Sequence, residues 1–142
     1  FDPMQLTSNS PNELIKYVRE GELQHGRAAM VGFLSLLTSE LLTDDLGINA
    51  LSSQSLMNQF PFWLSVALFE LGRMKAGWQN PFTKDGKAFD LEDTYQPGNV
   101  LGIDEDKYSD DLLNKELNNG RLAMIGTLGV MAQELVTGQP TF

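Results

Sequence analysis

The stretch ELQHGRAAMVGFLSLLTSELLT (Glu22–Thr43) returns near the end of the chain as ELNNGRLAMIGTLGVMAQELVT (Glu116–Thr137). About half of the aligned positions are identical, and they include a glutamate, a glycine–arginine pair and an alanine–methionine pair. The segment between the two copies is too long for a solenoid repeat. The sequence therefore predicts two related helices with a further element between them.

Helix signals divide the chain into three helices, predicted over about residues 12–43, 60–77 and 110–137. Pro11 marks the start of the first, and Ser109 with the two aspartates after it marks the start of the third. In the middle helix, Pro61 fits the first turn and Gly77 the end. No stretch alternates as a strand would. We expect a single all-α domain over residues 1–142.

Composition excludes several classes of function. The chain carries 19 Asp and Glu against 10 Lys and Arg, a net charge of −9, which argues against nucleic acid as a partner. It has no cysteine and one histidine, which excludes disulfides, thiol nucleophiles and His-rich metal sites within one chain. Because the sequence opens on Phe1 and not on Met, we expect that a targeting segment has been removed.

Hydropathy and residue pattern disagree about the membrane. A mean hydropathy of −0.20 and the lack of a long uncharged apolar run favour a soluble protein. However, each copy of the repeat continues into a largely apolar stretch, Ala28–Leu37 and Leu122–Ala132, in which small residues recur. Small residues allow helices to approach closely in lipid. Paired charges within the helices would hide such spans from a hydropathy scale.

The basic residues outside the helices are unevenly distributed. Lys16 and Arg19 are expected before the first helix, and further lysines lie between the second and third. No Lys or Arg occurs from Thr43 to Asn58 or from Gly138 onward. Three spans would place all basic segments on one side of a membrane, which is the positive-inside pattern. We therefore predict three transmembrane helices.

The charges of the repeat predict contacts between its two helices. Residues five apart on an α-helix are separated by about 140°, so Arg27 cannot comfortably reach Glu22, nor Arg121 reach Glu116. If the two helices cross about a pseudo-twofold axis, Glu22 meets Arg121 and Glu116 meets Arg27. Each charge is then neutralised across the interface, as an apolar environment requires.

Two other features complete this prediction. Gly26 and Gly120 occupy matched positions inside the charged clusters, where they would allow the two backbones to approach. In the middle helix, Glu70 and Arg73 are three residues apart and can pair locally.

Several polar side chains could ligate a metal centre. A carboxylate paired with arginine keeps free lone pairs, and neutral histidine and amide carbonyls also offer them. Glu22 and His25 share a helix face, as do Glu116 and Asn119, because three residues are nearly one turn. Gln133 follows Asn119 by about 21 Å along the same stripe. Magnesium accepts few ligands from protein when its other positions are filled.

These residues resemble a known family. ELQHGRAAM and ELNNGRLAMIGTLGVMAQ are similar to the first and third transmembrane helices of the light-harvesting chlorophyll-binding proteins, and FELGR to their middle helix. The resemblance covers most of the chain, and the motifs occur in the family's order. It implies that six residues supply axial ligands to chlorophyll magnesium: Glu22, His25, Glu70, Glu116, Asn119 and Gln133.

The resemblance also implies carotenoid sites. Phe1-Asp2-Pro3 resembles the family's motif before its first helix, and Tyr95–Asp104 the equivalent before its third, where carotenoid end groups usually dock. Asp2 and Asp104 are the residues implied, although Ile103-Asp104-Glu105 departs from the expected aromatic–Asp–Pro. The chain ends soon after its third helix and has no histidine after Gln133, which is more like the chlorophyll a/c antennae, of fucoxanthin or peridinin type, in red-lineage algae.

The function implied is light harvesting in the chloroplast thylakoid membrane. The chain would bind chlorophyll a, chlorophyll c and a xanthophyll, lie in thylakoid lipid as a multi-pass protein, and pass excitation to a photosystem core beside neighbouring antenna subunits. No bond is made or broken, so the chain would be no enzyme and have no catalytic residue. A photoprotective, energy-dissipating role within the same family is the main alternative.

Two alternatives lie outside the family. Glu22-x-x-His25 resembles half of a di-iron carboxylate site in a helical bundle, but the second copy supplies Glu116-x-x-Asn119 in place of a second Glu-x-x-His. The arginines at matched positions would also compete with a dication. A soluble acidic helical interaction module fits the hydropathy but leaves the repeated Glu–Arg pattern unexplained.

Overall fold

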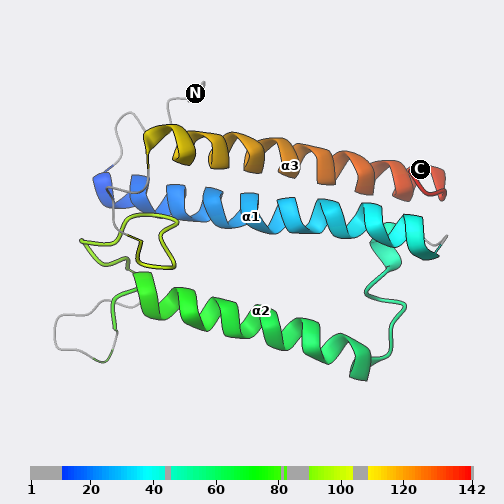
Figure 1. The fold of residues 1–142 in the computed structure, drawn as a ribbon, viewed down its shortest axis with the longest axis horizontal. Helices are drawn as coiled ribbons and strands as arrows, with labels where there is room; N and C mark the ends of the chain where they lie inside the picture. Colours follow the sequence, from blue (N-terminus) through cyan, green and yellow to red (C-terminus); the bar gives the residue numbers. More distant parts are fainter. Residues whose placement is uncertain (1–10, 44–45, 81, 83–89, 104–108, 142) are drawn as a thin grey trace.

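The computed structural model describes residues 11–43, 46–80, 82, 90–103 and 109–141. Its helices are α1 (Asn12–Thr43), the 3₁₀ helix η1 (Gly47–Asn49), α2 (Leu56–Gly77) and α3 (Asp110–Thr137). α1 and α3 lie side by side and run in the same direction, whereas α2 runs oppositely and lies apart from both (Figure 1). The prediction of an all-α fold with three long helices is confirmed, and the single domain over residues 1–142 stays a prediction.

Two details of the prediction need correction. α2 begins at Leu56 after Ser55 and not near residue 60, so Pro61 lies inside the helix, where it removes a backbone donor that a first-turn proline would not. α1 begins at Asn12, the start predicted for it, but the placement of Lys16 and Arg19 before this helix is wrong, because both lie within its first turns. Among the described residues, the one β-type contact is an isolated bridge between Trp78 and Leu91.

The closest approach of α1 and α3 is at the matched glycines. A Cβ atom added to Gly26 would lie 2.9 Å from the Cα of Gly120, and the reciprocal distance is also 2.9 Å. Both contacts are with backbone, so no side-chain movement could relieve them. Leu23 and Leu117, also matched in the repeat, are buried beside this crossing. The crossing predicted from the repeat is therefore present, and it requires glycine in both helices.

A second pair of matched residues joins the other ends of these helices. Glu40 and Glu134 are 4% and 1% exposed. Glu134 Oε2 accepts a hydrogen bond from Ile48 N at 3.0 Å, just after α1, and Glu40 Oε2 accepts one from Thr141 N at 2.9 Å, just after α3. Each glutamate thus holds the segment that follows the other helix. The repeat marked both positions, but it gave no indication of these backbone partners.

Large apolar side chains are exposed on all three long helices. On α2 they surround the helix: Leu56, Met57, Phe60, Phe62, Trp63, Leu64, Val66, Leu68, Phe69, Leu71 and Met74. In the part of the chain that the structure describes, no helix is both long enough and apolar enough to cross a membrane.

Candidate functional site

The structure brings both predicted interhelical ion pairs together. Arg27 Nε lies 2.7 Å from Glu116 Oε1, and Arg121 Nε lies 2.6 Å from Glu22 Oε1. These side chains are partly exposed, between 24% and 38%. Arg27 also donates from Nη2 to the carbonyl of Gly98, at 2.8 Å. The pairs therefore lie on either side of the glycine crossing, at the rim of the α1–α3 interface and not in its interior.

Each carboxylate of the crossed pairs uses one oxygen. Within the described residues, the Oε2 atoms of Glu22 and Glu116 accept no hydrogen bond. Charge balance comes from the arginine, and the second oxygen keeps its lone pairs. A neutral Glu–Arg unit with one free oxygen can ligate a metal centre without adding net charge to an apolar site.

Glu70 on α2 also pairs with an arginine through one carboxylate oxygen, but this arginine lies on the same helix. Arg73 donates to Glu70 Oε2 from Nε at 3.0 Å and from Nη2 at 2.6 Å. Both bonds end on the same oxygen, which leaves Oε1 without a partner in the described part of the chain. The Glu70 side chain is 43% exposed, so this oxygen is accessible from outside the protein.

His25 presents one ring nitrogen outward. Its Nδ1 lies 2.7 Å from the carbonyl oxygen of Gly21. A carbonyl oxygen only accepts, so Nδ1 carries the hydrogen and Nε2 of the neutral ring holds the lone pair. The residue is exposed on α1. This arrangement fixes the tautomer that a metal ligand requires.

The two amide candidates lie on α3. Asn119 and Gln133 are both exposed, and neither side chain makes a hydrogen bond within the residues that the structure describes. Asn119 lies one turn after Glu116, whereas Gln133 lies near the opposite end, beside the buried Glu134. Asp2 and Asp104, the predicted carotenoid-site residues, are outside the described residues.

A buried glutamate that sequence reasoning missed lies beside this site. Glu20 is 2% exposed, and its carboxylate accepts hydrogen bonds from Arg73, Gln24, Tyr95 and the backbone N–H of Gly98. The matched position in the second copy is an asparagine, so comparing the copies could not reveal it. Burial, and then the adjacent Glu20 carboxylate, raise the pKa of Tyr95 to about 12.

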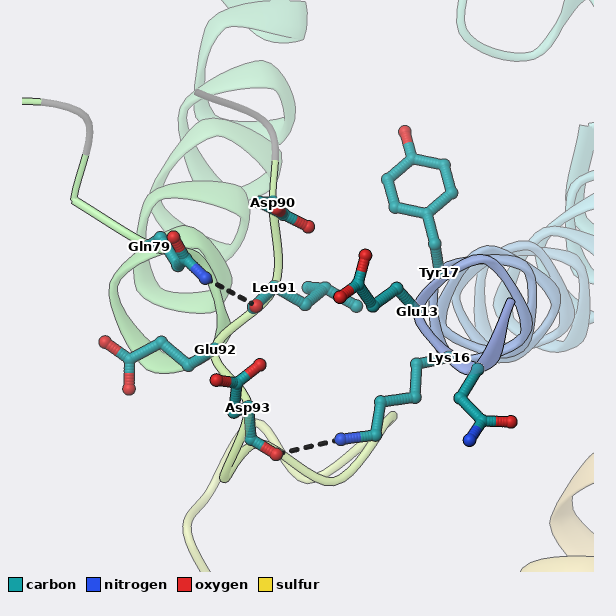
Figure 2. A pocket seen from close by; sticks show the side chains of 9 residues that line it. Glu13, Lys16, Tyr17, Gln79, Asp90, Leu91, Glu92 and Asp93 are labelled. Carbon is teal, nitrogen blue, oxygen red and sulfur yellow. Dashed lines mark hydrogen bonds between the residues drawn. The ribbon is translucent and has the colours of Figure 1, made fainter. Parts of the chain in front are cut away.

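An open hollow of about 380 Å³ lies between the start of α1 and the segment 90–93 (Figure 2). Its charged lining is mostly acidic, from Glu13, Asp90, Glu92 and Asp93, while Lys16 reaches across it to donate to the carbonyl of Asp93 at 2.8 Å. None of the predicted ligand residues lines this hollow. The candidate ligands instead lie along the outer faces of the helices.

Residues 1–135 match the chlorophyll A-B binding protein family. The chain belongs to this light-harvesting, chlorophyll-binding family. The family resemblance predicted from the two copies of the motif is thereby confirmed. Because these antenna proteins are not enzymes, the prediction that the chain has no enzymatic activity is confirmed as well.

Individual relatives of this light-harvesting chain come from several kinds of alga and plant. A fucoxanthin-chlorophyll a-c binding protein of Isochrysis galbana is 33% identical, over 97% of this chain and 73% of that protein. Light-harvesting complex stress-related protein 1 of Chlamydomonas reinhardtii is also 33% identical, over 96% of this chain and 60% of that protein. A chlorophyll a-b binding protein of Petunia hybrida is 28% identical over 97% of this chain and 58% of that protein. The chain thus spans less than two thirds of the last two.

Proposed function

We propose that this chain is an antenna protein that binds chlorophylls and carotenoids and transfers excitation energy to a photosystem core. The observation that carries the proposal is the shared geometry of Glu22, Glu70 and Glu116. In each, arginine occupies one carboxylate oxygen, and the other oxygen is left free on a partly exposed face. Carboxylates that are paired with arginine through one oxygen and keep the other oxygen free suit the axial position of magnesium in a neutral macrocycle.

The proposed ligand set has six members: Glu22, His25, Glu70, Glu116, Asn119 and Gln133. The outward Nε2 of His25 and the unbonded amides of Asn119 and Gln133 support their inclusion. Bound chlorophyll would supply light absorption, and the protein's part is to hold each pigment at a fixed distance and orientation. The helices are suited to this, because the glycine crossing and the ion pairs lock α1 against α3.

We propose that α1, α2 and α3 cross the thylakoid membrane of a chloroplast. At about 1.5 Å per residue, the 22 residues of α2 span about 33 Å, which is close to the hydrocarbon thickness of a bilayer. Its exposed apolar side chains are costly in water and suited to lipid or pigment. The charges that lower the hydropathy of the helices are largely buried or paired, as polar groups in lipid must be.

The pigments we propose are chlorophyll a, chlorophyll c and a xanthophyll. The likeness to a fucoxanthin-chlorophyll a-c binding protein supports chlorophyll c. Asp2 and Asp104 remain the residues proposed to lie near carotenoid ends. The proposed partners are a photosystem core, neighbouring antenna subunits and thylakoid lipid.

Photoprotective energy dissipation is a second candidate function. The likeness to a stress-related light-harvesting protein is as high as that to the fucoxanthin type, at 33% identity. Both functions need the same pigment ligands, so they differ in the fate of the excitation and not in the ligand set.

The two functions are separated by fluorescence. The full chain, refolded with chlorophyll a, chlorophyll c and a xanthophyll, is expected to show xanthophyll bands in the excitation spectrum of chlorophyll a emission. A harvesting protein keeps a long chlorophyll fluorescence lifetime in detergent, whereas a dissipating one shortens it. Failure of the chain to bind any chlorophyll would contradict both functions.

A further inference from the structure

Arg73 of α2 contacts two carboxylates on different helices. Its Nε and Nη2 donate to Glu70, and its Nη1 donates to Glu20 Oε1 at 3.2 Å. Arginine can make this bridge because its planar fork directs donors toward two partners at once. The contact with Glu20 is an ion pair between α2 and α1, in addition to the local pair within α2.

Glu20 is fully committed to holding its neighbours. Oε1 accepts from Arg73 and from Gln24, and Oε2 accepts from Gly98 N at 2.7 Å and from the Tyr95 hydroxyl at 3.2 Å. With two donors on each oxygen and 2% exposure, this carboxylate has no lone pair or space for a pigment. It differs in this respect from Glu22, two residues later.

Among the described residues, the side-chain contacts of α2 with α1 and with the segment that contains Tyr95 gather at the end of α2. The ring of Tyr95 lies against Gly77, where an added Cβ would come within 2.7 Å of ring atoms. Arg73 stacks over the Trp78 ring at 5.8 Å, and Trp78 meets Tyr17 of α1 edge-to-face at 6.0 Å. The rest of α2 lies apart from α1 and α3 (Figure 1). The orientation of α2, and of Glu70, therefore depends on this end.

We propose that Glu20 is a positioning residue that acts through Arg73 to fix the free Glu70 oxygen relative to α1, and so sets the site of the pigment bound there. The inference rests on the proposed function. Without the Glu20 charge, Glu70 would be the one remaining ionic partner of Arg73 in the described part of the chain, and the ion pair that joins Arg73 to α1 would be lost. The pigment ligand on α2 would keep its chemistry but lose its fixed position.

The test uses the full chain refolded with pigments and read by low-temperature absorption. Glu70→Leu defines the band of the pigment on α2, and His25→Leu defines a band of a pigment on α1. In Glu20→Gln, we expect the absorption band of the pigment at Glu70 to shift. Half-occupancy of this site should need about 10-fold more chlorophyll, as when an outer partner of a metal ligand is removed. The His25 band is expected to stay unchanged. Glu13→Gln, an exposed glutamate on the same helix, is the matched control.

Two further variants separate positioning from folding. Arg73→Lys keeps the charge but lacks the fork that reaches both carboxylates, so it should reproduce the shift of the Glu70 band even if Glu20→Gln folds poorly. In a Glu70→Leu background, Glu20→Gln should alter no further band.

The inference is overturned if both variants leave the Glu70 band in place, or if they weaken the Glu70 and His25 bands equally. Its failure is distinguishable from failure of the proposed function. If the proposed function is wrong, the unaltered chain would bind no chlorophyll, or Glu70→Leu would remove no absorption band.

Discussion

At Glu22, Glu70 and Glu116, one arginine occupies one carboxylate oxygen and leaves the other free. At Glu20, Glu40 and Glu134, burial to 4% exposure or less commits the carboxylate to the protein. Environment thus divides chemically identical side chains into two groups, proposed pigment ligands and structural acceptors. The glutamates of the helices therefore serve both purposes, and the residue type alone does not show which glutamate belongs to which group.

Arg121→Leu tests the crossed ion pairs. It leaves Glu22 charged and partly buried without its partner, so we expect a loss of about 1–3 kcal/mol in stability and reduced pigment at Glu22. The measurement is the temperature at which the refolded complex loses its visible circular dichroism. Lys115→Leu is the control, because the Lys115–Asp111 pair is 68% and 73% exposed and should contribute less than about 1 kcal/mol. Equal effects of the two substitutions would contradict the role of Arg121.

Because of Tyr95, we expect the stability of the folded protein to depend on pH in the alkaline range. Its pKa in the folded state, about 12, is above the ordinary value of 10.0, so the folded state holds this proton more tightly than the unfolded state does. The contribution to stability is complete below pH 10 and is lost as pH rises toward 12. We expect the stability of Tyr95→Phe to fall less steeply than that of the unaltered chain over this range. Parallel pH profiles would show that folding does not raise the pKa of Tyr95.

At the scale of the helix pair, the crossing at Gly26 and Gly120 sets how closely α1 and α3 approach. Backbone meets backbone there, which brings the arginine of each helix within reach of the glutamate of the other. A wider separation would break both ion pairs together. The close crossing at the glycines and the two glutamate–arginine pairs of the repeat therefore depend on each other.

Gly26→Ala tests the close approach of α1 and α3. The added methyl group would lie 2.9 Å from the Gly120 Cα, and overpacking of this kind costs about 1–3 kcal/mol. Gly32→Ala is the matched control, since no atom lies within 4 Å of its added Cβ and alanine is the better helix former. Thermal unfolding of the two variants should show Gly26→Ala destabilised and Gly32→Ala neutral or stabilised. Similar unfolding temperatures would contradict the close crossing.

Much of the helix pair could be predicted from the two copies of the motif. The five-residue spacing of glutamate and arginine excludes pairing within one helix, so the crossed pairs follow from geometry. Glu20 could not be found in this way, because position 114 is an asparagine. The partners of Glu40 and Glu134 are backbone amides, which leave no signal in the side-chain sequence. The sequence predicts the start of α2 too late, because Pro61 fits a first turn as well as the sixth helical position that it occupies.

At the scale of the whole molecule, α1 and α3 form a locked pair, and α2 stands beside them (Figure 1). The side-chain contacts that join α2 to α1 are made by Arg73 and Trp78, near the end of α2. Exposed leucines, phenylalanines and tryptophan on most sides are typical of a helix that other molecules cover. We infer that pigments and lipid cover these surfaces and complete the packing between α2 and the pair. The protein then acts as a frame whose contacts fix pigment positions.

Whether this frame holds chlorophyll can be measured in an absorption spectrum of the purified native protein. We expect chlorophyll a bands at the red end of the visible spectrum, with added bands of chlorophyll c and a xanthophyll. Chlorophyll should stay with the protein through purification in mild detergent. A purified, folded protein without chlorophyll absorption would show that the helices do not serve as a pigment frame.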